Sequence, residues 1–280
     1  MRKLLLTLLL AVPAAAAFAQ TTTDDGLSFG ARAQVEAEAK LAPGLHLTAH
    51  EQLRYYFNGE DILRLHTGIG LEYKVFPFMK VGAEYELINR YEMDEDLNAP
   101  VWSIRHRGNF FVTGTLKTGD WQFGLKETLR LTNRTGEYNS WQGPRNILAL
   151  KSKASVKYLG WGSVVPYAAF EVRNALNDAA YSATYDPSAE KNKDRYLNEK
   201  LLGYTDSYVS RLRAELGVTV KFNKRHALEF YLLGDHYKDK QVDTNREGSD
   251  SWEKNGLVLK SIDWHVGNMV TAGVGYKWSF

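Results

Sequence analysis

The chain has 280 residues, a formal net charge of +2 at pH 7 and no cysteine. The near-neutral charge argues against nucleic acid as a partner, because proteins that bind nucleic acid concentrate basic residues. Without cysteine the protein forms no disulfide and carries out no thiol chemistry. Its stability must come from a continuous hydrogen-bonded fold.

The first residues have the pattern of a secretory signal peptide. Two basic residues precede an apolar run, Leu4–Val12, and a small-residue cleavage site, Ala17–Ala19. We expect residues 1–19 to be removed before Gln20, which leaves 20–280 as a single domain with equal numbers of basic and acidic residues. No later apolar run reaches the length of a transmembrane helix.

Nearly every later segment alternates between apolar and polar residues, which predicts strands with one apolar face. From Phe29 to Leu41 the odd positions are apolar and most even positions carry Arg, Gln, Glu or Lys. The next strands are expected at 45–55, 63–73 and 81–87. They are separated by turns at Ala42-Pro43-Gly44 and Phe76-Pro77-Phe78 or by polar connections.

The second half of the chain continues the pattern in long segments. Strands are expected at 102–116, 121–131, 148–158, 164–172, 208–222, 228–236 and 266–280. Short turns alternate with long polar connections, which are 92–100, 133–145, 174–206 and 238–265. Most of these strands exceed the ~5–6 residues typical of soluble sheets and suit a tilted membrane crossing. The sequence therefore predicts an all-β, antiparallel, outer-membrane β-barrel of ten to twelve strands, with short periplasmic turns and long extracellular loops.

The strand count leaves one question open. Eleven strands are evident, whereas single-chain bacterial barrels usually have an even number. A twelfth strand is expected either in Tyr196–Tyr204 or in Trp252–Ile262. The alternative is that the first segment is not a full wall strand.

The last strand ends in a terminal aromatic with aromatics two and four residues before it: Tyr276, Trp278 and Phe280. This ending resembles the C-terminal recognition strand of bacterial outer-membrane barrels, which the insertion machinery reads. The resemblance implies location in the outer membrane of a Gram-negative bacterium, with outer-membrane lipid and the insertion machinery as partners. Other aromatics gather near the short turns, as an interfacial girdle does.

Several short stretches resemble the outer-membrane barrels grouped as domain-of-unknown-function family 2490. They are Glu51–Arg54, Gly70–Tyr73, Pro166–Glu171, Ser210–Arg213 and Gly275–Phe280. The family has no established activity, so the resemblance implies fold and location alone.

Charged residues dominate the parity that should face the lumen, and bases outnumber acids there by about two to one. The expected charge wall comprises Arg54, Arg64, Arg130, Glu171, Arg173, Arg211, Arg213 and Glu215. One interpretation is a narrow porin-like channel whose arginines favour small polar or anionic solutes. The other is a closed barrel, filled by paired charges, with a structural or adhesion role.

Glu51 and Glu127 fall on the apolar parity. Because a carboxylate facing lipid is costly, we expect a β-bulge to turn each one inward, next to Arg54 or Arg130.

A second alternative function is an outer-membrane hydrolase. Asp94 and Asp96, with Asp263 and His265, have the Asp-x-Asp and Asp-x-His spacings of an outer-rim protease site, where they would activate water. No metal site or cofactor is expected, because His46 and His50, the nearest pair of histidines on one strand face, lie about 13 Å apart in an extended chain.

Overall fold

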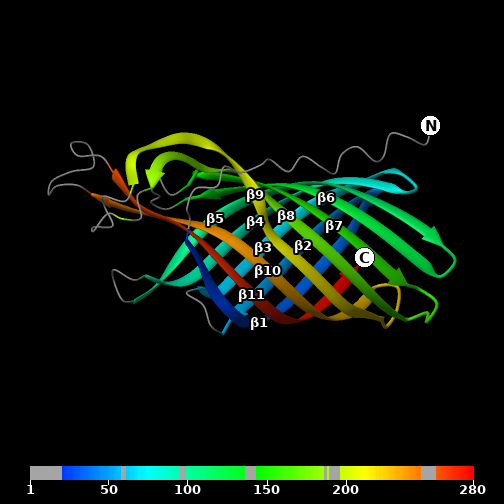
Figure 1. The fold of residues 1–280 in the computed structure, drawn as a ribbon. Coiled ribbons are helices and arrows are strands. Elements are labelled where there is room, and N and C mark those ends of the chain that lie inside the picture. The colour runs from blue at the N-terminus through cyan, green and yellow to red at the C-terminus, as the bar shows by residue number, and fades with distance from the viewer. Residues whose placement is uncertain are drawn as a thin grey trace.

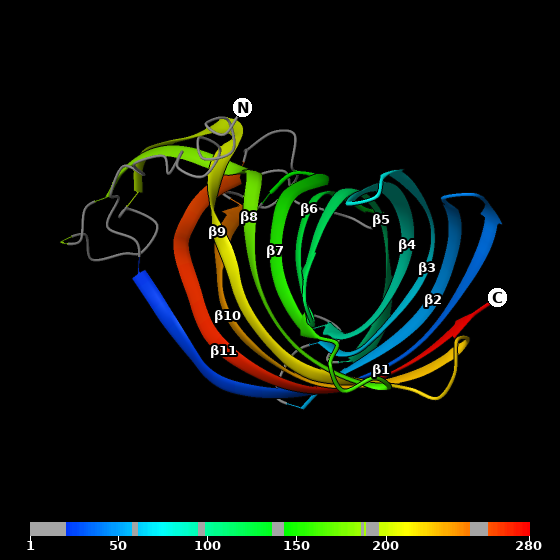
Figure 2. The ribbon, with the colours of Figure 1, turned by 90° about the vertical axis from the view of Figure 1, so that its right-hand side faces the viewer.

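The strands of this protein form one closed barrel (Figures 1 and 2). The structure is a computed structural model that describes residues 21–57, 61–94, 99–135, 143–185, 188, 196–246 and 257–280. Within these residues there are eleven strands: β1 (Thr21–Ala42), β2 (Leu45–Tyr56), β3 (Asp61–Phe76), β4 (Met79–Asp94), β5 (Ala99–Thr118), β6 (Trp121–Arg134), β7 (Asn146–Tyr158), β8 (Val164–Tyr185), β9 (Tyr196–Lys221), β10 (His226–Arg246) and β11 (Leu257–Ser279). In the same residues no helix is long and apolar enough to cross a membrane.

The barrel closes through a parallel seam. Consecutive strands pair antiparallel, but β1 pairs with β11 in parallel, from Thr21 opposite Asp263 to Glu38 opposite Ser279. An odd number of strands can close only in this way, because the first and last strands then run in the same direction. The expected even number is therefore wrong, and β1 is a full wall strand.

Neither candidate for a twelfth strand is separate. Tyr196–Tyr204 is the beginning of β9, and the described part of the other candidate, residues 257–262, is the beginning of β11. The two segments have the alternating pattern of separate strands because β9 and β11 are long and extend beyond the closed part of the barrel. At the opposite end of β11 the C-terminus lies beside the short turns (Figure 1).

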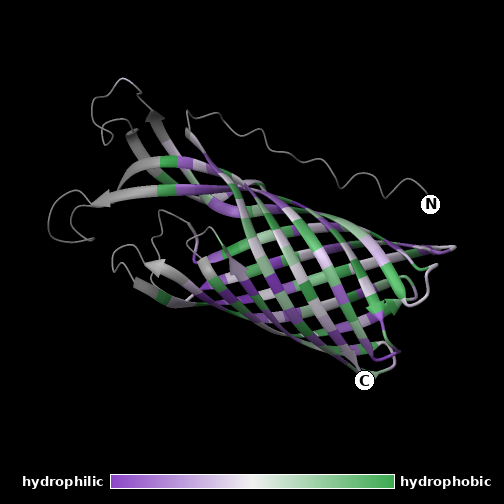
Figure 3. Cartoon of the chain, turned by 90° about the horizontal axis from the view of Figure 1, so that it is seen from below, coloured by the Kyte–Doolittle hydropathy of each residue, from purple (hydrophilic) through white to green (hydrophobic). Residues whose placement is uncertain are grey.

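Side chains alternate across the wall as the sequence predicts. On β5, Phe110 is 60% exposed on the outer face, whereas its neighbour Asn109 is 5% exposed on the lumen face. Figure 3 shows the hydrophobic and hydrophilic positions alternating along the strands. The arrangement is the reverse of a soluble protein, because the apolar residues cover the outside and the polar residues fill the inside.

The short turns use residues suited to tight reversals. Gly44, after Pro43, has φ of 79°, a conformation that favours glycine. At the turn between β9 and β10, the side-chain oxygen of Asn223 accepts hydrogen bonds from the backbone N–H groups of Arg225 (2.7 Å) and His226 (2.9 Å). These local bonds fix the register of each hairpin.

Aromatic rings contact one another at the short-turn end. Trp121 lies 4.9 Å from Tyr158, and Trp278 lies 4.1 Å from Phe280. The Phe280 backbone N–H also donates to the carbonyl of Glu38 at 2.9 Å. The chain end is thus held against β1.

Glu51 and Glu127 stay on the outer face, so the expected bulges are wrong. The register runs without a shift through Glu51, opposite Val35 and Thr67, and through Glu127. Each carboxylate accepts a hydrogen bond from a hydroxyl on the next strand: Glu51 from Thr67 (3.0 Å) and Glu127 from Ser152 (2.6 Å). A hydroxyl group on the neighbouring strand therefore satisfies each carboxylate, and no bulge turns it toward the lumen.

The β8–β9 hairpin bends where it leaves the wall. Its register shifts repeatedly between Arg173 and Thr184, and β9 stops pairing with β10 at Arg211. Shifts of this kind bend a strand pair, and the hairpin arches over the long-loop end (Figure 1). It packs against β10 and β11 in a small apolar cluster of Ala179, Tyr181, Leu201, Tyr204, Val242 and Ile262.

Candidate functional site in the barrel lumen

Four arginines form a row across the lumen face of four neighbouring strands. Arg32 of β1 is the Cα partner of Arg54 of β2, Arg54 is the partner of Arg64 of β3, and Arg64 is the partner of Arg90 of β4. We call these four residues the arginine row. Like charges directly opposite one another destabilise a sheet. The arginine row should therefore lower the stability of the barrel, so its presence needs an explanation other than stability.

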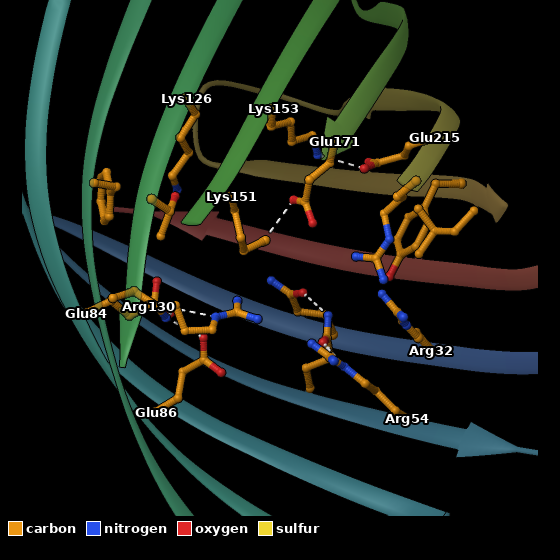
Figure 4. Close-up of a pocket in the computed structure, with 18 of the residues that line it drawn as sticks. Arg32, Arg54, Glu84, Glu86, Lys126, Arg130, Lys151, Lys153, Glu171 and Glu215 are labelled. Atoms are coloured by element: carbon orange, nitrogen blue, oxygen red, sulfur yellow. Dashed lines mark hydrogen bonds and ion pairs between the residues drawn. The ribbon is translucent and has the colours of Figure 1, made fainter. Parts of the chain in front are cut away.

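A cavity of about 320 Å³ lies in the lumen beside the arginine row. Its lining includes Arg32 and Arg54 and draws on every strand except β3 and β11. Figure 4 shows the labelled side chains pointing into this space from several strands. A second cavity, of about 260 Å³, shares Lys126 and Glu215 with the first and extends to Lys157 near a short turn.

Acidic groups in the lumen pair mainly with lysines. Lys151 lies 2.8 Å from Glu171, and Lys153 lies 2.7 Å from Glu215. Glu215 also accepts a hydrogen bond from the Tyr167 hydroxyl at 2.8 Å. These acids were expected in the charge wall, but they compensate lysines rather than arginines.

Two arginines of the expected wall do hold acids. The Nε and Nη2 atoms of Arg213 donate to the two oxygens of Asp235 at 2.6 and 2.9 Å, and Asp235 is 3% exposed. Arg173 donates to the Ser210 hydroxyl at 2.8 Å and lies 3.6 Å from Asp239. Asp235 is thereby fully committed to one guanidinium.

Four further arginines of the lumen, Arg32, Arg54, Arg130 and Arg211, have no carboxylate partner within the described residues. Arg54 Nε donates to the Gln52 side chain at 2.6 Å, and Arg130 Nε donates to Asn109 at 3.1 Å. The Nε of Arg211 is buried without a hydrogen-bond partner. Arg32 is 7% exposed, and neither its Nε nor its Nη2 has a partner. Amides, which carry no charge, leave the positive charge of these groups uncompensated.

Three side chains of the lumen contact the carboxylate of Glu86. It lies 3.1 Å from His66 Nδ1 and 3.0 Å from Arg107 Nη1, and it accepts a hydrogen bond from Asn109 at 2.8 Å. This network ties β3, β4 and β5 together on the lumen side. It makes Glu86 a structural counter-ion for Arg107.

A cluster of possible metal ligands, missed by the sequence reasoning, lies beside this network. One ligand atom each from His50, Glu84 and Glu86 falls within 4.8 Å of the others. His50 reaches across β3 because Gly68 leaves room, since a Cβ there would meet the imidazole at 2.1 Å. The glycine was the only signal in the sequence. Since Arg107 already neutralises Glu86, the cluster offers little net negative charge to a cation.

Two residues of the hydrolase hypothesis, Asp263 and His265, have described side chains, and both lie on β11. Asp94 ends β4, whereas Asp263 and His265 belong to β11, which is not a neighbour of β4. His265 Nδ1 lies 2.9 Å from Asp25 of β1. Asp96 lies outside the described residues, so the catalytic pairing stays a prediction.

The other expected site residues lie where the alternation puts them. Arg64, in the arginine row, has its guanidinium 5.2 Å from the centre of the Tyr56 ring. Tyr276, Trp278 and Phe280 end the chain at the short-turn side, and His226 stacks on Trp278 at 6.4 Å. Comparison with protein-family models and with curated proteins found no match to this chain.

Proposed function

We propose that this protein is an outer-membrane β-barrel of a Gram-negative bacterium that forms a narrow channel favouring small polar anions. The signal-peptide pattern at residues 1–19 and the aromatic end at Phe280 support export and insertion by the barrel machinery. An outer face rich in exposed apolar side chains suits contact with outer-membrane lipid. On the motifs quoted above, we also propose membership in domain-of-unknown-function family 2490.

The single observation that carries the channel is the uncompensated arginine charge beside the lumen cavity. Arg32 and Arg54 line this cavity, and no carboxylate of the described residues pairs with either. Guanidinium groups remain charged at physiological pH. Fixed positive charge inside a low-dielectric wall raises the local concentration of anions.

A closed barrel with a structural or adhesion role is the second candidate, and a specific observation favours it. Four lumen side chains, His66, Ile88, Ser210 and Thr271, are almost fully buried. They lie farther along their strands from the short turns than most residues of the cavity lining. A packed layer at this level would narrow the lumen on the long-loop side of the cavity.

Solute uptake into proteoliposomes separates the two candidates. The probes are acetate, acetamide and ethylammonium, which have similar size and differ in charge. A channel governed by the arginine row admits acetate fastest, and the double variant Arg32→Gln, Arg54→Gln loses most of that preference. The matched control removes two basic charges from an exposed turn, Lys224→Gln with Arg225→Gln, and keeps the preference.

Two results would count against the channel. Folded protein that passes none of the three solutes would leave the closed barrel as the explanation. Equal uptake of acetate and ethylammonium would show that the arginine row does not act on solutes.

A further inference from the structure

We infer that the lumen contains a binding site for a small oxyanion, a carboxylate or a phosphate, held by the Nε–Nη2 edge of Arg32. The inference deepens the proposed function, since it assigns to the channel a saturable site and a ligand class. It requires only a lumen that such an ion can enter. It does not require that the barrel conduct from end to end.

The Arg32 side chain is buried with donor atoms that bond to nothing in the described residues. Its Nε and Nη2 atoms are both buried and both lack a hydrogen-bond partner, and the residue is 7% exposed. A buried charge without a partner is strongly destabilising, and each unsatisfied buried donor adds to that cost. A group in this state is stabilised by whatever anion reaches it.

Another arginine of the same lumen, Arg213, binds a carboxylate through this edge. Arg213 uses the same edge, Nε and Nη2, to hold both carboxylate oxygens of Asp235 at 2.6 and 2.9 Å. This side-on fork matches two oxygens of a carboxylate or phosphate and discriminates in favour of them over a spherical halide. Arg32 presents the same fork with nothing in it.

No acid in the described part of the chain pairs with the Nε–Nη2 edge of Arg32. Asp235, the acid near Arg32, is occupied by Arg213. Glu36, four residues along β1 from Arg32, lies 2.9 Å from Lys277. Arg32 therefore has no acidic partner because the neighbouring acids are already paired with other bases.

The lumen cavity gives access to Arg32 and brings a second donor, Arg54, beside it. Arg32 and Arg54 both line the cavity of about 320 Å³, which is larger than a small carboxylate or phosphate ion. Gln52 accepts the Arg54 Nε–H and is itself bonded to Gln34 at 2.6 Å. This chain of amides fixes the Arg54 guanidinium while leaving its terminal N–H groups without a partner in the described residues. An oxyanion on Arg32 would thus meet a second, oriented cation.

Thermal unfolding of the folded barrel in neutral detergent tests the site without any transport. The probes are sodium phosphate and sodium acetate in separate titrations, each against sodium chloride at equal ionic strength. A ligand that binds only the folded state raises Tm in a saturable way. We expect at least one of the two oxyanions to raise the Tm of the wild type above the chloride reference. Which one does so identifies the preferred geometry.

Arg32→Gln should abolish the oxyanion-specific rise in Tm. Arg32→Lys keeps the charge but loses the fork, so it should also abolish the rise while retaining the anion preference in uptake. Lys224→Gln, at an exposed turn, should leave the rise unchanged. Equal curves for chloride and both oxyanions in the wild type, or a full rise in Arg32→Gln, would overturn the site. Either result would leave the proposed channel standing, because anion preference in uptake is measured separately.

Discussion

At the scale of single residues, the partner of each charge matters more than the number of charges. The surplus of bases on the lumen parity is visible in the sequence, but which arginine lacks an acid depends on the strand register. Arg213 belongs to a buried bidentate pair with Asp235, whereas the Nε and Nη2 atoms of Arg32, three strands away around the barrel, have no hydrogen-bond partner in the described residues. The two arginines should therefore respond to substitution in opposite ways.

Arg213→Gln should destabilise the barrel by about 3–5 kcal/mol, because it leaves the Asp235 carboxylate buried without a counter-charge. The measurement is the urea midpoint of the folded protein in detergent, followed by tryptophan fluorescence. Lys80→Gln is the control, since Lys80 is 43% exposed at its pair with Glu72 and should cost less than about 1 kcal/mol. Similar losses for both variants would show that Asp235 is not sealed from water.

The carboxylate of Glu127 tests what surrounds the outer face. In a lipid bilayer Glu127→Leu should stabilise the barrel by about 1–2 kcal/mol, because it removes a charged group from the apolar surface. The measurement is reversible unfolding in lipid vesicles, with Glu72→Leu as the lumen-facing control that should not stabilise. A loss of stability in Glu127→Leu would indicate that this carboxylate serves a contact with another molecule.

At the scale of strands and turns, alternation predicts most of the wall. The period of two, the Pro–Gly turn at 42–44 and the aromatic end at Phe280 depend on local residues, so the sequence alone places them. The parallel seam depends on how the first and last strands meet, which no local pattern encodes. The inward bulges at Glu51 and Glu127 were wrong for a related reason, since a hydroxyl on the neighbouring strand satisfies each carboxylate.

The seam can be tested by cross-linking, because the chain has no cysteine of its own. Ala33 and Val274 are Cα partners across β1 and β11 and share the outer face. The double variant Ala33→Cys, Val274→Cys should be joined efficiently by a short bismaleimide and should migrate as a constrained chain on denaturing gels. Ala33→Cys with Leu216→Cys, on β9, is the control pair and should not react. Cross-linking of the control alone would refute the parallel closure.

At the scale of the whole molecule, the barrel reverses the usual distribution of polarity. The apolar groups are outside, so they stabilise the fold only in an apolar surrounding, and the hydrogen-bonded wall has no free edge to pair with other chains. The interior is then free to carry charge that a solvent-surrounded core could not hold. The arginine row is an example of such internal charge, because its four like charges oppose one another on adjacent strands.

The measurement that tests the central claim most directly is the reversal potential of the wild-type protein in a planar lipid bilayer under a potassium chloride gradient. Uncompensated arginines beside the cavity predict a potential displaced toward the chloride equilibrium value. The double variant Arg32→Gln, Arg54→Gln should move it toward zero, and the turn variant Lys224→Gln, Arg225→Gln should leave it in place. A potential on the potassium side, or no current from protein shown to be folded, would contradict the account.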